Sequence, residues 1–264
     1  MPSKSPVALK LAATAGLLFL HLPILLIFLY AFTTEERSFA FPPPGLTTKW
    51  FAVAWNRADI WPPLVLSVQV ALLSTGLALV LGTLISAAMS GARFWGRDQL
   101  SLLIVLPIAL PGVVTGIALR SAIPMLHLDF SWFTIVLGHA TFCIVIVYNN
   151  AVARFRRLSG GILEASADLG ANAFQTFRHI LLPNLGTALM AGGMLAFALS
   201  FDEVIVTIFM AGGVKTLPIW IFQSFRLANQ VPLVNVAGVV AILLSVIPVY
   251  LATRLSSGVA GSRT

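Results

Sequence analysis

Six long apolar segments limit what this chain can fold into. They occupy roughly residues 10–32, 62–90, 99–123, 132–152, 185–211 and 233–254. Each is long enough to cross the hydrocarbon core of a membrane, about 30 Å thick, as a helix. Helices are favoured because each satisfies its own backbone hydrogen bonds, and the segments do not alternate as barrel strands do. The sequence therefore predicts an all-α membrane protein with six transmembrane helices.

The composition excludes a soluble or a disordered chain. Of the 264 residues, 58% are hydrophobic and only 9% are charged, whereas soluble domains carry about 25% charged residues. The net charge of +7 comes from basic residues that stand between the apolar segments. Such residues indicate membrane orientation rather than nucleic-acid binding. The single cysteine, Cys143, excludes an intramolecular disulfide.

The basic residues also predict the orientation of the chain. The two termini and the loops after the second and fourth segments carry ten Lys or Arg residues, and the opposite loops carry six. Because cytoplasmic loops are enriched in these residues, both termini are expected in the cytoplasm. The first segment is too long for a signal peptide and has no small-residue cleavage site after it. We expect residues 1–264 to form one multi-pass transmembrane domain.

Proline and glycine interrupt two of the segments. Pro107 and Pro111, with Gly112 and Gly116 nearby, predict a kink or a break in the third segment. In the fifth segment, the pair Gly192–Gly193 allows another helix to approach closely. We interpret that pair as suited to an interface with a second membrane subunit.

The longest polar loop on the predicted inner side, residues 153–184, has the pattern of two short helices. Residues 162–169 suit the first helix, which Gly170 can end in a left-handed conformation. Asn172 can cap the second helix, and Pro183 is expected to end it before the fifth span. The loop also carries Leu163, Leu169, Phe174, Phe177 and Ile180. Exposed apolar residues indicate a docking surface or, alternatively, a helix pair lying in the lipid interface.

The same loop resembles the EAA loop of permeases from binding-protein-dependent ABC transporters. The family pattern is Glu-Ala-Ala, three residues, Gly, nine residues, Ile, one residue and Leu-Pro. The chain matches this pattern at Glu164, Ala165, Gly170, Ile180, Leu182 and Pro183, and departs from it at Ser166. The resemblance covers about residues 10–255 and implies the MetI-like (type I) ABC permease fold. It also implies that the loop docks on a cytoplasmic ATPase, with Glu164 and Gly170 central to the contact.

The resemblance implies further partners and a location. These are a second, non-identical permease, two cytoplasmic ABC ATPases and a periplasmic solute-binding protein, assembled in a bacterial inner membrane. Residues 212–216 are similar to the end of a P-loop, but the glycine that precedes the lysine is missing. ATP and Mg are therefore expected on the ATPase subunits. We expect this chain to be no enzyme and to bind no cofactor itself.

Two adjacent carboxylates, Asp202 and Glu203, lie near the predicted outer end of the fifth segment. Acidic residues in an apolar helix are costly and usually functional, so they are candidates for a pathway that attracts a cationic solute. The alternatives are an ion pair with Lys215 or Arg226, or a contact between helices. With residues 216–220, the pair resembles the spermidine/putrescine subgroup of these permeases. Transporters of ferric iron and small anions share parts of that pattern.

Two other classes of protein remain as rivals to an ATP-driven importer. A self-sufficient secondary transporter or channel would place ionisable residues near the membrane midplane, where this chain has almost none. An intramembrane enzyme would need a paired nucleophile and base, or metal ligands. The four histidines have no metal-ligand spacing. We therefore expect no catalytic and no metal-binding residues.

Overall fold

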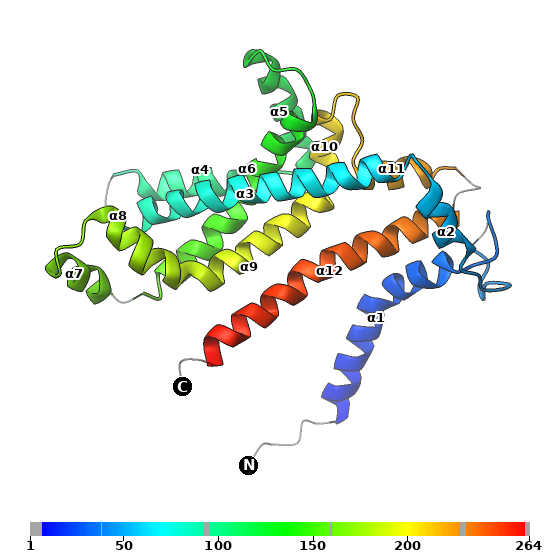
Figure 1. The fold of residues 1–264 in the computed structure, drawn as a ribbon, viewed down its shortest axis with the longest axis horizontal. Helices are drawn as coiled ribbons and strands as arrows, with labels where there is room; N and C mark the ends of the chain where they lie inside the picture. The colour runs from blue at the N-terminus through cyan, green and yellow to red at the C-terminus, as the bar shows by residue number, and fades with distance from the viewer. Residues whose placement is uncertain (1–6, 38, 92–94, 159, 228–230, 262–264) are drawn as a thin grey trace. The chain divides into compact units, whose positions relative to one another are not determined.

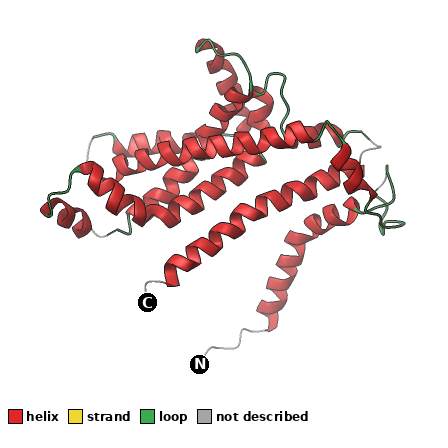
Figure 2. Cartoon of the chain, viewed as in Figure 1, coloured by secondary structure: helices red, strands yellow, loops and turns green. Residues whose placement is uncertain are grey.

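The structure, a computed structural model, describes residues 7–37, 39–91, 95–158, 160–227 and 231–261. Within these ranges the chain is helical, and its one β pairing is an isolated bridge between Thr33 and Leu46 (Figure 2). In chain order (Figure 1), the helices are α1 (Val7–Ala31), α2 (Lys49–Asn56), α3 (Trp61–Gly91), α4 (Arg97–Ala109), α5 (Gly112–Met125), α6 (Trp132–Phe155), α7 (Gly160–Asp168), α8 (Ala173–Thr176), the π-helical turn η1 (Phe177–Leu181), α9 (Leu182–Phe201), α10 (Ile205–Met210), α11 (Leu217–Ser224) and α12 (Val231–Gly261).

Among the described residues, five helices are long and apolar enough to cross a membrane. They are Val7–Ala31, Trp61–Ser90, Trp132–Phe155, Ala173–Phe201 and Val231–Pro248. Helices α4 and α5 together make a sixth candidate, bent by 105° at the break between them. The predicted all-α membrane class is confirmed, and so is the break in the third span.

Local sequence explains the bend between α4 and α5. Leu110 has an extended backbone with ψ of 146° because the proline that follows disfavours the helical region. Pro111 then precedes the first turn of α5, where a missing N–H costs no hydrogen bond. Farther along, Gly116 lies where any Cβ would collide with the ring of Phe209 in α10. The glycine therefore permits the close approach of α5 and α10.

The chain divides into two compact units, of which the first comprises Met1–Trp61 and Trp220–Leu244. Its core contains Ala31, Trp50, Leu233, Val236 and Val239. The indole of Trp50 donates a hydrogen bond of 2.8 Å to the Thr33 carbonyl, so this buried polar group is satisfied. Most of α1 lies outside this core, and Phe19 is 79% exposed. Such a surface suits lipid rather than water.

An ion pair marks the loop between α2 and α3 within the first unit. Arg57 Nη2 and Asp59 Oδ2 are 2.6 Å apart, and the Trp220 indole donates to the same oxygen over 3.2 Å. The hydrogen bond from Arg57 lowers the pKa of the Asp59 carboxyl. Because the two side chains are 29% and 49% exposed, solvent screens the pair and it contributes little to stability.

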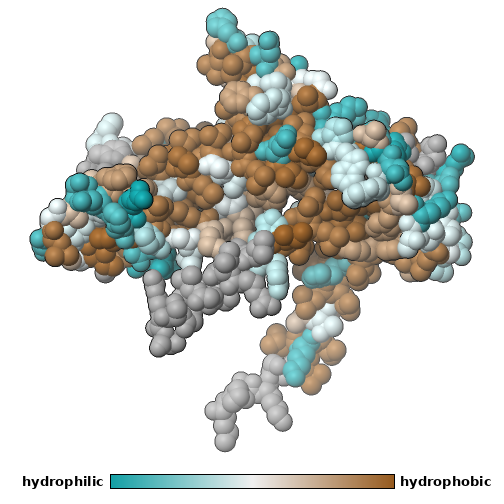
Figure 3. Space-filling model, in the orientation of Figure 1, coloured by the Kyte–Doolittle hydropathy of each residue, from teal (hydrophilic) through white to brown (hydrophobic). Residues whose placement is uncertain are grey.

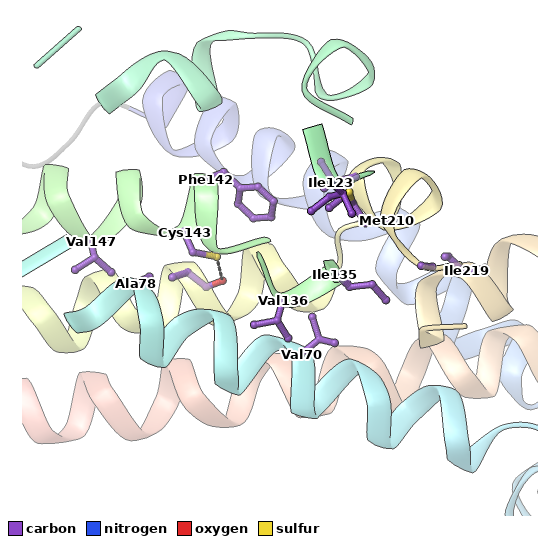
Figure 4. Packing of buried hydrophobic residues seen from close by; sticks show 13 residues of the cluster. Val70, Ala78, Ile123, Ile135, Val136, Phe142, Cys143, Val147, Met210 and Ile219 are labelled. Carbon is purple, nitrogen blue, oxygen red and sulfur yellow. Dashed lines mark hydrogen bonds between the residues drawn. The ribbon is translucent and has the colours of Figure 1, made fainter. Parts of the chain in front are cut away.

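The second unit comprises Pro62–Ile219 and Ser245–Thr264, with α6 at its centre. Figure 4 shows how Val70 of α3 and Met210 of α10 lie in one cluster with Val136 and Cys143 of α6. The Cys143 thiol donates a weak hydrogen bond of 3.4 Å to the Ala196 carbonyl. This core fixes α9 and α10 against α6.

Gly192 and Gly193 lie inside this unit rather than on a subunit interface. A Cβ on Gly192 would lie 3.3 Å from the backbone of Val147 in α6, and one on Gly193 would lie 3.3 Å from Leu79 in α3. Both glycines are buried. The expectation that they serve a second subunit was wrong, because they allow α9 to approach α6 and α3 of its own chain.

Apolar side chains cover much of the visible surface, drawn in brown in Figure 3. The exposed apolar side chains of the second unit include Leu72 of α3 and Leu102 of α4, which are 58% and 69% exposed. A soluble chain would pay a large hydration cost for so much apolar surface. The exposed faces of these helices therefore suit contact with lipid.

Candidate functional site

The loop that matches the EAA pattern folds as α7, a tight turn and α8. Gly170 has φ of 75°, and its N–H donates to the Ala167 carbonyl over 2.9 Å. Ala171 N–H donates to the Ser166 carbonyl over 3.1 Å. These bonds close the end of α7 with glycine in the left-handed region, where other residues are strained. The predicted turn at Gly170 is confirmed.

Asn172 begins α8 with a reciprocal cap. Its side-chain oxygen accepts from Gln175 N–H over 2.9 Å, and the Gln175 side chain accepts from Asn172 N–H over 2.9 Å. The two bonds satisfy backbone donors that the first turn of a helix leaves free. The predicted cap is confirmed, and the glutamine completes it.

Ser166 replaces the second alanine of the family pattern and is nevertheless buried, with 3% exposure. Its Oγ lies 2.8 Å from Oγ1 of Thr176, at the last residue of α8. The hydroxyl pair therefore ties α7 to α8 and fixes the angle of the loop. Sequence reasoning had treated the serine as a small replacement for alanine and missed this bond.

The outer surface of the loop is apolar. Leu169 is 88% exposed and Phe174 is 66% exposed, and Leu163 is also exposed. Glu164 and Ala165 lie on the same short helix, where both are exposed to solvent. The small polar side chain is thus buried while large apolar ones face outward. This inversion is typical of a surface that another molecule or a lipid layer covers.

Ile180, Leu182 and Pro183 do not separate two helices. The expectation that Pro183 ends the second helix was wrong, because α8, η1 and α9 form one continuous helix over Ala173–Phe201. In the π-helical turn, Leu182 N–H donates to the Phe177 carbonyl. Pro183 directly follows this turn, as the second residue of α9.

Side chains satisfy carbonyls around Pro183. The amide of Asn184 donates to the Ile180 carbonyl over 2.7 Å, and Nε of Arg154 in α6 donates to the Asn184 carbonyl over 3.0 Å. Both bonds add side-chain support to the helix on either side of the proline. The arginine also ties this point of the loop to the end of α6.

Asp202 and Glu203 lie in a break between α9 and α10, not within a helix. The predicted segment 185–211 differs in this respect, since α9 ends at Phe201 and α10 starts at Ile205. Glu203 Oε1 accepts from Val206 N–H over 2.9 Å and so caps α10. The carboxylate of Asp202 is exposed. Within the described residues, neither carboxylate forms an ion pair, so the alternative of a pair with Lys215 is wrong.

His139 of α6 is buried and hydrogen-bonds to the helices on both sides of this break. Its Nδ1 lies 2.8 Å from Ser200 Oγ at the end of α9, and its Nε2 lies 2.8 Å from Thr207 Oγ1 in α10. Thr207 Oγ1 donates to the Glu203 carbonyl over 2.6 Å. The threonine proton is thus used, so Nε2–H donates to Thr207 and Nδ1 accepts from Ser200, as in a neutral imidazole.

We call His139, Ser200 and Thr207 the histidine clasp. Sequence reasoning had grouped His139 with scattered histidines because it sought metal spacing. The useful signal was its position in an apolar helix, where an imidazole needs hydrogen-bond partners. Among the described residues, no group of three His, Cys, Asp or Glu side chains could hold a metal ion.

Comparison with known proteins identifies relatives of this arrangement. Residues 78–261 match the family described as "Binding-protein-dependent transport system inner membrane component". The spermidine/putrescine transport system permease protein PotC of Escherichia coli (strain K12) is 29% identical over 237 residues, covering 89% of each chain. The putrescine transport system permease protein PotI of the same strain is 31% identical over 220 residues, 80% of this chain and 78% of PotI.

A solved structure has the same fold. It is a bacterial alginate ABC transporter in complex with an alginate pentasaccharide-bound periplasmic protein. The match has a TM-score of 0.73 at 12% identity and covers 96% of this chain and 93% of the other. With the family match extending over more than half of the sequence, this chain belongs to the inner-membrane components of binding-protein-dependent transport systems, as a MetI-like ABC permease subunit.

Proposed function

We propose that this permease forms half of the pathway of an ATP-driven importer for polyamines such as putrescine and spermidine. The exposed carboxylate of Asp202 carries the proposal, because it lies in a helix break without an ion-pair partner among the described residues. A carboxylate that no cation of its own chain neutralises can attract a cationic solute. The permeases PotC and PotI, whose names specify polyamines, support this substrate class.

The two carboxylates have different roles in this proposal. Glu203 is occupied by the N–H of Val206 and maintains the start of α10. Asp202 makes no side-chain hydrogen bond among the described residues and remains open to a solute. We therefore assign the solute contact to Asp202 and the shape of the break to Glu203.

The coupling loop, residues 153–184, is proposed to dock on a separate ATPase subunit. Leu169 and Phe174 supply an exposed apolar surface, with Glu164 beside it on α7. ATP and Mg are bound by two ATPases in this arrangement, and this chain binds no cofactor. The single transmembrane domain pairs with a second permease, both termini lie in the cytoplasm, and a periplasmic solute-binding protein delivers the solute. The solved alginate complex with its periplasmic protein supports that last partner.

Uptake of labelled putrescine and spermidine tests the substrate. Cells that lack this chain, with the rest of the system intact and other polyamine importers deleted, are complemented with the wild type, Asp202→Asn or Asp129→Asn. Asp129 is an exposed aspartate of the same unit and serves as the matched control. We expect wild-type and Asp129→Asn cells to take up polyamine and Asp202→Asn to lose at least about fivefold, the equivalent of about 1 kcal/mol.

The other outcomes point to the rival functions. Unchanged polyamine uptake without the chain would discard the substrate and direct the same assay to ferric iron and small anions. Uptake that depends on the chain but persists after ATP depletion, with the proton gradient intact, would favour a secondary transporter or channel. Full uptake by Asp202→Asn would keep the importer and remove the aspartate from the pathway.

A further inference from the structure

A polar cavity of about 210 Å³ lies where the end of α3, the start of α4 and the end of α6 meet. Its polar lining comes from Ser90, Arg97, Asp98, Ser101, Tyr148 and Arg156. The larger cavities of the second unit, of about 420 and 410 Å³, are lined almost wholly by apolar side chains. Arg97, Asp98 and Arg156 are exposed, so the polar cavity is open to the surface and a molecule from outside can enter it.

The charges of the cavity favour an anion. Arg97 and Arg156 come from different helices, and within the described residues neither guanidinium forms an ion pair. Asp98 is the one carboxylate in the lining, so the lining keeps one net positive charge. A guanidinium binds phosphate oxygens through two parallel hydrogen bonds. Two such groups facing one cavity are a suitable frame for a phosphate group.

The wall of the cavity also offers neutral hydrogen-bonding groups. Ser101 Oγ and the Tyr148 hydroxyl are 3.1 Å apart, and Tyr148 is buried in α6. Only one of these two protons is used in the bond between them, so the pair keeps a second donor. The volume corresponds to about seven water molecules at roughly 30 Å³ each, enough for a phosphate with a small substituent.

The residues around the cavity indicate which kind of molecule carries the phosphate group. No described side chain of α4 is buried, and Leu102 and Leu103 on its surface are widely exposed. Trp95, just before α4, is 95% exposed, and tryptophan is typical of the interface between membrane and water. Acyl chains can lie along α4 while a headgroup enters the cavity. Basic cavities between membrane helices bind phospholipid headgroups in this way.

We propose that this cavity binds the phosphate group of an anionic phospholipid and thereby joins α4 to α6. Asp98 disfavours headgroups with a carboxylate and accepts hydrogen bonds from headgroups with free hydroxyls, such as phosphatidylglycerol. The site is separate from the polyamine pathway and does not depend on the transported solute.

Thermal unfolding of the full chain, purified in neutral detergent with its copurifying subunits, tests the site. The added probes are phosphatidylglycerol, phosphatidylcholine and inorganic phosphate. We expect phosphatidylglycerol to raise the Tm by roughly 2–4 °C and the other two to have little effect. The rise should vanish in Arg97→Gln/Arg156→Gln and persist in Arg157→Gln, which changes an exposed arginine outside the cavity.

A second variant distinguishes loss of the binding site from loss of folding. Arg97→Lys/Arg156→Lys keeps both charges and removes the forked donors, so we expect at least threefold weaker binding of phosphatidylglycerol. An unchanged response of both double variants, or no response of the wild type, would overturn the site. An equal response to inorganic phosphate would keep the phosphate site and overturn the lipid as its source.

Discussion

The two ends of the helix over Ala173–Phe201 differ in which side chains are buried and which are exposed. At one end, the coupling loop exposes Leu169 and Phe174 and buries the small polar Ser166. At the other end, the break after α9 buries Phe201 and Val206 and satisfies its polar groups internally, except for the exposed carboxylate of Asp202. The loop therefore leaves an apolar surface uncovered, whereas the apolar residues of the break are covered within the chain.

This difference separates what each end needs from other molecules. The break keeps its shape through the histidine clasp and the cap from Glu203. The loop keeps its internal angle through Ser166 and Gly170 but leaves its apolar face open. Changes at the break should therefore destabilise the chain, and changes on the loop surface should affect its partners.

The largest effect on stability is expected from His139→Ala. The change leaves the buried hydroxyls of Ser200 and Thr207 without their shared partner and opens a cavity, at a cost of about 2–4 kcal/mol. The Tm in detergent should fall by many degrees. His21→Ala is the control, because His21 lies exposed on α1. If the two variants unfold at the same temperature, the clasp does not hold the break.

Gly170→Val should nearly abolish uptake while the protein stays in the membrane. A β-branched residue at φ of 75° is strained by about 1–2 kcal/mol and will shift the turn between α7 and α8. Uptake and the amount of membrane-bound protein are measured together. Gly161→Ala, in α7 with open space at its Cβ, is the matched control and should transport normally. Normal uptake by Gly170→Val would show that the turn is not needed.

Leu169→Asp should separate partner binding from stability. The side chain is 88% exposed, so its replacement should change the free energy of unfolding by less than about 0.5 kcal/mol. The quantity of ATPase that copurifies with the tagged chain should fall severalfold. Leu46→Asp, in the loop before α2 and 66% exposed, is a control for an added charge. A large decrease in Tm with normal copurification of the ATPase would mean that Leu169 contributes to stability and not to partner binding.

Ser166→Ala should have the smallest effect. It restores the alanine of the family pattern and removes one hydrogen bond with Thr176, which is worth about 0.5–1.5 kcal/mol. Uptake should fall less than about twofold, with a small decrease in Tm. Thr176→Val should give the same result, and the double variant should add nothing further. Additive losses would mean that the two hydroxyls do not act as a pair.

Features that depend on neighbours in sequence could be predicted from the sequence alone. The six apolar segments, the break near Pro111, the turn at Gly170 and the cap at Asn172 each follow from a short stretch of residues. Helix breaks, turns and caps are decided by local geometry. For that reason the turn and the cap of the coupling loop were predicted correctly, whereas the continuation of its second helix through Pro183 was not.

Features that depend on contacts between residues far apart in the sequence could not be predicted from it. His139 reaches partners 61 and 68 positions away, and periodicity carries no information on such contacts. Pro183 lies within a continuous helix, where Asn184 bonds to the turn before it and Arg154 of α6 bonds to the carbonyl after it. Glu203 caps α10 because the segment after Phe201 bends, which hydropathy alone did not show.

The unbroken helix of 29 residues over Ala173–Phe201 also has a mechanical meaning. At 1.5 Å per residue it is a rod about 43 Å long, and at Gly192 it lies so close to α6 that a Cβ would be 3.3 Å from the backbone of Val147. If that contact acts as the fulcrum, the arm toward Phe174 is about twice as long as the arm toward Asp202. The rod is then a reducing lever: a wide sweep at the loop becomes a shorter, opposite and more forceful displacement at the carboxylate.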